Sequence, residues 1–146
     1  MSTIDPKDEA RRAERFKRVR DAHQTELAED YVKLIAELIE EKGEARLVDL
    51  SGRLGVTKAT VNNTIQRLQR DGFVTSQPYR AIFLTDKGRK LARASRERHH
   101  VVRDLLIALG VDAEVAATDA EGIEHHVSKA TLEAFRKFLN KARRAR

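Results

Sequence analysis

The chain has 146 residues, enough for one compact unit or two small subdomains, and it contains no apolar run long enough to cross a bilayer. The lack of cysteine excludes disulfides and the thiolate metal sites of zinc fingers, and the polar N-terminus favours a cytoplasmic location over secretion. The formal net charge of +6 favours a polyanionic partner such as nucleic acid.

The first expected element is a long helix, because neither Pro nor Gly interrupts residues 8–42. Gly43 suits the position just after its last turn. Basic residues crowd segment 1–24, which is either a helical extension or a separate short helix. This segment and the basic C-terminus could equally contact phosphates or serve as solubilising ends. The stripe expected to be buried on the long helix is Leu27, Tyr31, Leu34, Ile35 and Leu38.

Two short helices joined by a tight turn are expected next. Gly55 ends the first helix, and Thr57 is placed to cap the second. A glycine-containing turn between two short helices is typical of the helix-turn-helix motif. The residues expected to point inward are Leu47, Leu50 and Leu54 in the first helix and Val61, Ile65 and Leu68 in the second.

A short β-hairpin follows the motif. Residues 73–74 and 82–84 are rich in β-formers, and the stretch between them contains the turn residues Gln77-Pro78-Tyr79-Arg80. A hairpin in this position is typical of the wing of a winged helix-turn-helix domain.

The rest of the chain is expected to be helical. Thr85 is placed to cap a helix over residues 86–109, and Ser128 to begin the last helix. The expected fold is therefore mainly α, with a winged helix-turn-helix DNA-binding domain over residues 1–93 and an all-helical domain over 94–146. The apolar positions expected to be buried are Leu91, Val101, Leu105, Leu109, Leu132, Phe135, Phe138 and Leu139.

The exposed face of the second motif helix is rich in amides, where a merely solvated helix would usually carry Glu and Lys. Amide side chains can pair with adenine, and lysine with guanine, in the major groove. A helix-turn-helix used for protein contacts is the alternative. The base-contact candidates are Lys58, Asn62, Asn63 and Gln66, and the phosphate-contact candidates are Thr57, Thr60 and Arg80.

The stretch TDAEGIEHHVS places two carboxylates and an imidazole within one possible helical turn. Glu121, Glu124 and His125 are spaced i, i+3 and i+4, whereas His126 points elsewhere. One interpretation is a cation site. The other is a solvated helix start, because Thr118 and Glu121 have the spacing of a capping box.

Several stretches together resemble a known family: EDYVKLIAELIEEKGEARLVDLSGRLGV, YRAIFLTDKG, RERH and DAEGIEHHVS. They resemble the manganese transport regulators of the diphtheria toxin repressor family, from about Glu26 to Phe138. The resemblance implies a cytoplasmic homodimeric repressor, not an enzyme, that binds operator DNA when Mn(II) bridges the DNA-binding and dimerisation domains. Fe(II) is the alternative metal. The ligands it implies are Asp30, His99, Glu121, Glu124 and His125.

Two positions depart from the family pattern. Lys33 replaces an expected carboxylate ligand, and an ammonium group cannot ligate a cation. The chain is then expected to bind one ion, to bind it weakly, or to pair Lys33 with Glu121 or Glu124. Asn63 stands where relatives often have lysine, so the operator preference is not transferable. The alternative function is a metal-independent or iron-responsive DNA-binding regulator; a metalloenzyme ranks third because the chain lacks an H-E-x-x-H motif.

Overall fold

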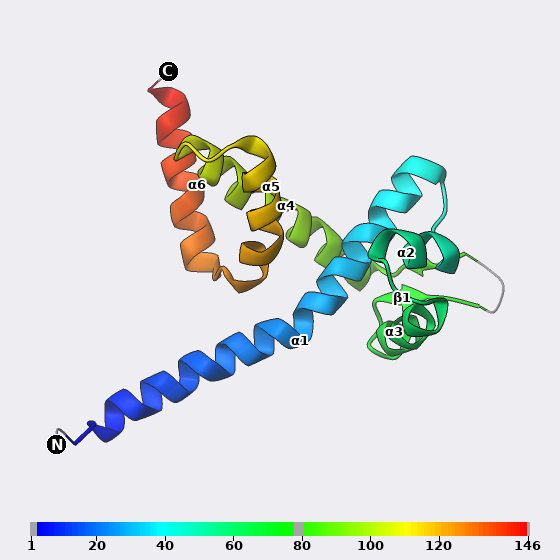
Figure 1. Cartoon of the computed structure of the whole chain (residues 1–146), viewed down its shortest axis with the longest axis horizontal. Helices are drawn as coiled ribbons and strands as arrows, with labels where there is room; N and C mark the ends of the chain where they lie inside the picture. The colour runs from blue at the N-terminus through cyan, green and yellow to red at the C-terminus, as the bar shows by residue number, and fades with distance from the viewer. Residues whose placement is uncertain (1–2, 78–80, 146) are drawn as a thin grey trace. The chain divides into compact units, whose positions relative to one another are not determined.

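The computed structural model describes residues 3–77 and 81–145 and is mainly helical, as the sequence predicts (Figure 1). Two compact units make up the chain, one formed by Ala28–Val101 and the other by Met1–Leu27 together with Val102–Arg146. The helices are α1 (Pro6–Lys42), α2 (Leu47–Leu54), α3 (Lys58–Arg70), α4 (Asp86–Ala108), α5 (Ala113–Ile123), the 3₁₀ turn η1 (Glu124–His126) and α6 (Lys129–Arg144), and the strands are β1 (Val74–Thr75) and β2 (Phe83–Leu84).

Helix α1 is continuous, so the basic N-terminal segment is a helical extension and not a separate helix (Figure 1). Residues 6–21 of this helix are all exposed to solvent. Tyr31, Ile35 and Leu38 are buried as expected, but the prediction for Leu27 is wrong, because its side chain is 43% exposed. Among the residues of α1, those that pack against the core of the unit Ala28–Val101 begin only at Ala28, one residue after Leu27.

The core of the unit Ala28–Val101 joins the helix-turn-helix to the wing. Buried side chains of α1 meet Leu50 of α2 and the buried face of α3, formed by Val61, Ile65 and Leu68. β1 and β2 pair antiparallel, with Val74 opposite Leu84. The amide of Ile82 also donates to the carbonyl of Ala45 at 2.8 Å, which ties the wing to the segment before α2. The predicted winged helix-turn-helix is therefore confirmed.

Helix α4 starts very close to the first strand of the wing. A Cβ atom on Gly88 would lie 2.1 Å from the carbonyl oxygen of Phe73, so only glycine permits this approach. The amide of Gly88 also donates to the Thr85 hydroxyl at 3.1 Å, which confirms Thr85 as the cap of this helix. The same bonding pattern confirms Thr57 as the cap of α3 and Ser128 as the cap of α6.

The capping-box interpretation of Thr118 and Glu121 is wrong. Asp112 caps α5, and its carboxylate accepts from the amide of Glu114 at 3.2 Å. Thr118 lies inside the helix, where its hydroxyl donates to the carbonyl of Glu114 at 3.1 Å. The chain reaches helical geometry six residues earlier than the capping box would require, because Asp112 is a stronger N-cap than Thr118.

The second unit buries the side chains of Val102, Ala116, Ala120, Leu132 and Leu139. Two residues expected to be buried are instead exposed in the single chain, Leu109 at 64% and Phe138 at 47%. Leu109 lies in the turn that follows α4, and Phe138 lies on a face of α6 that the unit's own helices do not cover. Helical periodicity identifies an apolar position but does not tell which partner covers it.

Two ion pairs join α1 to α4 inside the unit Ala28–Val101. Arg98 donates to the buried carboxylate of Glu29. Closer to the solvent, Arg96 forms a two-pronged pair with Glu40, at 3.1 and 3.0 Å. The hydrogen bond from Arg96 holds the pKa of Glu40 below its ordinary value. Both pairs fix the rotation of α4 against α1.

We predict that Glu29→Gln lowers the free energy of unfolding by about 2–3 kcal/mol, because it leaves the Arg98 guanidinium partly buried without its counter-charge. Glu40→Gln, which disrupts the exposed pair on the same two helices, is the matched control and should have a smaller effect. Urea unfolding of the three proteins measures the difference. Equal losses in the two variants would show that burial does not distinguish these pairs.

Candidate nucleic-acid interface and metal-ligating residues

Helix α3 has one buried face and one exposed polar face. Val61, Ile65 and Leu68 are buried in the core, which turns the opposite side of the helix to solvent. That exposed side carries the four base-contact candidates, Lys58, Asn62, Asn63 and Gln66. The burial pattern therefore leaves these side chains accessible to the edges of bases in a major groove.

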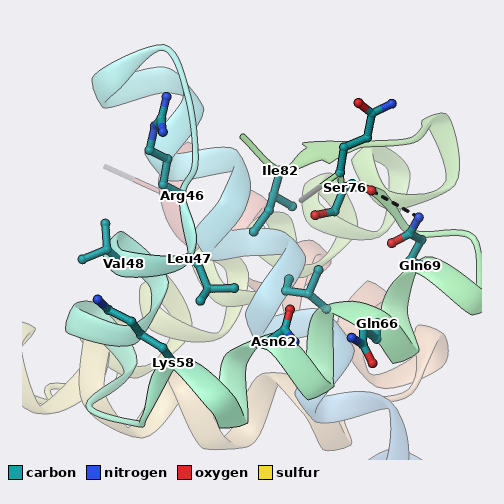
Figure 2. A pocket seen from close by; sticks show the side chains of 11 residues that line it. Arg46, Leu47, Val48, Lys58, Asn62, Gln66, Gln69, Ser76 and Ile82 are labelled. Carbon is teal, nitrogen blue, oxygen red and sulfur yellow. Dashed lines mark hydrogen bonds between the residues drawn. The ribbon is translucent and has the colours of Figure 1, made fainter. Parts of the chain in front are cut away.

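Three of the four candidates line one open depression of about 1070 Å³. Figure 2 shows Lys58, Asn62 and Gln66 on α3, with Arg46 just before α2, Val48 in the first turn of α2 and Ser76 on the wing side. The floor of the depression is apolar and includes Ile65 and Ile82. A concave surface lined by amides and basic side chains suits a ligand that presents both hydrogen-bonding edges and negative charge.

Four polar residues of this surface were missed by the sequence analysis: Arg46, Gln69, Ser76 and Gln77. Gln69 lies three residues after Gln66 on α3, so helical spacing could have identified it. Its side-chain amide donates to the carbonyl of Ser76 at 3.3 Å, which ties the end of α3 to the wing (Figure 2). Arg46 bonds Glu44 at 2.7 Å, and this contact raises the pKa of Arg46 above its ordinary value. It therefore carries a permanent positive charge beside α3.

Asn63, Thr57 and Thr60 do not line this depression. Asn63 is exposed but does not line it, because adjacent residues on a helix point about 100° apart. Thr57 and Thr60 are exposed at the start of α3, where the Thr57 hydroxyl donates to the Thr60 hydroxyl at 2.9 Å. Arg80 lies outside the described residues.

Two of the metal-ligand candidates, Asp30 on α1 and His99 on α4, belong to the unit Ala28–Val101. Both are half-buried. They follow Glu29 and Arg98 in the chain, and the ion pair between those two residues holds the two helices together next to the candidates. The buried pair therefore limits how far Asp30 and His99 can separate.

The other three candidates lie where α5 ends. Glu121 is exposed in the last turn of α5, whereas Glu124 is fully buried and His125 only 7% exposed in η1. Nε2 of His125 lies 3.6 Å from Oε1 of Glu124 and 4.0 Å from Oε1 of Glu26. Two ligand atoms on one ion, each bonded at about 2.1 Å, lie about 3–4 Å apart, so each of these two pairs of donor atoms has a spacing that a shared divalent cation permits.

Glu26 is a donor that the sequence analysis did not identify. It lies on α1, and its carboxylate faces His125. Its position four residues before Asp30 was an available signal, because residues four apart share a face of a helix. A carboxylate, an imidazole and a second carboxylate without sulfur suit Mn(II) or Fe(II) better than softer metals.

The fold and these donor residues define a winged-helix DNA-binding protein whose second unit carries buried metal-binding chemistry. Residues 23–82 match the iron dependent repressor N-terminal DNA binding domain, and residues 85–145 match the iron dependent repressor metal binding and dimerisation domain. The chain belongs to the iron-dependent repressor family, so the family resemblance seen in the sequence is confirmed. Among the described residues, no helix combines the length and the apolar character that a membrane span requires.

Similar proteins carry the names of metal-responsive regulators. The chain is 52% identical to the transcriptional regulator MntR of Escherichia coli O157:H7 over 134 residues, which is 92% of this chain and 86% of that protein. It is 41% identical to the HTH-type transcriptional regulator MntR of Bacillus subtilis (strain 168) over 100 residues, or 68% of this chain and 70% of that one. A solved manganese-dependent transcriptional repressor complex with manganese is similar over 77% of this chain, with a TM-score of 0.71 and 30% identity. The match covers 52% of that longer chain.

We predict that Asn62→Ala relaxes base preference at one position of each half-site, at a cost of about 1–3 kcal/mol for the preferred base. Arg46→Ala should instead weaken binding to all sequences and reduce the slope of log affinity against log salt by about one. Measuring affinity for a panel of operator variants at several salt concentrations separates the two effects. If both variants lose affinity uniformly, the assignment of Asn62 to base recognition is wrong.

Proposed function

We propose that the protein is a manganese-responsive repressor of metal-transport genes that acts on operator DNA in the cytoplasm. The observation that carries this proposal is the combination of an exposed amide-rich face on α3 with the buried Glu124–His125 pair in η1. The family matches support it, because they cover a DNA-binding domain and a metal-binding and dimerisation domain in the same order.

The proposed ligands are Asp30, His99, Glu121, Glu124 and His125. Mn(II) supplies positive charge that holds these donors in one arrangement. Because Mn(II) binds more weakly than later divalent metals to most sites, selectivity depends on the number and geometry of oxygen donors. Glu124 is fully buried. A bound cation stabilises a buried carboxylate more than one exposed to water, so the burial of Glu124 strengthens cation binding.

The proposed active form is a homodimer through the second unit. Leu109 and Phe138 are large apolar side chains exposed on this unit, as are Ile107, Val115 and Ile123. A group of exposed large apolar side chains indicates a surface that another protein chain covers. A two-fold dimer presents two α3 helices, which read successive major grooves when they lie about 34 Å apart.

In this proposal, metal binding controls DNA binding by shifting the equilibrium between conformations of the protein. Mn(II) favours the arrangement in which both α3 helices fit the operator only to the extent that it binds that arrangement more tightly. Operator DNA must then increase Mn(II) affinity by the same factor.

We predict that Mn(II) tightens operator binding of the natural protein by roughly 5–150-fold at fixed salt, the usual range of such coupling. His125→Ala should lose most of this effect while keeping the same melting behaviour in metal-free buffer. Fluorescence anisotropy with and without Mn(II) measures the coupling. His100→Gln, which removes an exposed imidazole outside the ligand set, is the control. An unchanged response of His125→Ala would exclude the proposed ligand set.

The surroundings of Lys33 favour an alternative, a regulator with weak metal dependence. Lys33 lines a depression of about 200 Å³ together with Arg89, Arg93, Arg96 and the Glu40 carboxylate that pairs with Arg96, so the lining carries a net positive charge within the unit Ala28–Val101. A cluster of cations one turn from Asp30 opposes the binding of another cation nearby. In this alternative, DNA binding depends little on Mn(II).

We predict that Lys33→Glu increases Mn(II) affinity and raises the stoichiometry from about one toward two ions per chain. A unit charge at about 4–6 Å and an effective dielectric near 20 contributes a few kcal/mol, reduced by screening. Lys33→Met removes the positive charge without adding a ligand, so it should raise affinity but not stoichiometry. Calorimetric titration of the three proteins distinguishes charge from ligation. Identical titrations would mean that position 33 does not influence the metal.

A further inference from the structure

A second group of metal-ligating side chains lies beside the proposed manganese ligands but shares none of them. Nδ1 of His23 lies 3.3 Å from Oε2 of Glu26, one turn further along α1. The ring of His126 packs edge-on against the ring of His23, with 4.9 Å between their centres. One ligand atom from each of these residues lies within 4.8 Å of the others. All three belong to the unit formed by Met1–Leu27 and Val102–Arg146.

We propose that His23, Glu26 and His126 form a second, accessory site for a divalent transition metal such as Zn²⁺ or Ni²⁺. Two imidazoles and one carboxylate are the donors these ions prefer, and three protein ligands leave positions open for water. The Irving–Williams order gives such a nitrogen-rich set higher affinity for Ni²⁺ or Zn²⁺ than for Mn²⁺. The accessory site therefore differs in metal preference from the proposed manganese site, whose ligands are mainly carboxylates such as Glu124.

The exposure of these side chains favours exchange with metal in solution. His23 and His126 are exposed, and Glu26 is half-buried. A depression of about 510 Å³ lies against His126 and is lined also by Arg15 and Arg18. This space gives an ion access and gives room for water or an anion as its remaining ligands.

Glu26 connects the accessory site to His125. Its Oε2 atom faces His23, whereas its Oε1 atom lies 4.0 Å from Nε2 of His125. An ion bound by Oε2 fixes the carboxylate and withdraws electron density from it. It also ties the turn of α1 at His23 to η1, the segment that holds Glu124 and His125. An accessory ion thereby adjusts the position of two proposed manganese ligands without contacting either.

The test is a Zn²⁺ titration of the full-length, metal-free protein by calorimetry, with the imidazole nitrogen resonances followed by NMR. His23→Gln and His126→Gln each keep a polar side chain of similar reach but lose the imidazole. Both should bind one ion fewer per chain than the natural protein. In the natural protein, Zn²⁺ should shift the ring resonances of both His23 and His126. The control His100→Gln removes one imidazole outside the triad and should keep the natural stoichiometry.

Unchanged stoichiometry in both His23→Gln and His126→Gln would overturn the accessory site, as would an equal loss in His100→Gln. This result is independent of the manganese proposal, which depends on the response of His125→Ala to Mn²⁺. His23→Gln should still bind operator DNA more tightly with Mn²⁺, since His23 is not among the proposed manganese ligands.

Discussion

The packing of α1 against α4 in the unit Ala28–Val101 is the constraint on which the rest of that unit depends. Apolar residues of α1 pack against both the helix-turn-helix and the wing. The buried pair between Glu29 and Arg98 then fixes the rotation of α4. A buried ion pair adds little net stability compared with apolar packing. However, rotating one helix would separate the two charges and leave one of them buried without its partner, which is costly. The pair therefore fixes the orientation of α4 relative to α1. Because Asp30 and His99 are the next residues in these helices, the pair also restricts their positions.

The recognition surface is a consequence of this core. Val61, Ile65 and Leu68 must face α1 and α2, so Asn62 and Gln66 necessarily face outward. The bond from Gln69 to the Ser76 carbonyl adds the wing to the same surface. A rigid scaffold that carries exposed amides loses little conformational entropy on binding, because only side chains must be ordered.

The proposed metal-binding site depends on a local change in helix geometry. Helix α5 ends at Ile123, and the next three residues form a 3₁₀ turn that directs Glu124 and His125 into the protein while His126 stays exposed. Burying a carboxylate beside an imidazole is costly without a compensating charge. The same turn places His126 against His23, so one short segment supplies donors to two different groups.

Sequence alone determined the order and type of the elements other than α5 and η1, since hydrophobic spacing and the caps Thr57, Thr85 and Ser128 are local properties. It also predicted that Asn62 and Gln66 are exposed, because they lie opposite an apolar stripe on one helix. Only the tertiary structure revealed the neighbours of Glu26, His23 and Arg46, which include residues distant in sequence. It also decided that Leu109 and Phe138 remain exposed. A periodic pattern specifies which face of a helix is apolar, but only packing in three dimensions specifies what that face meets.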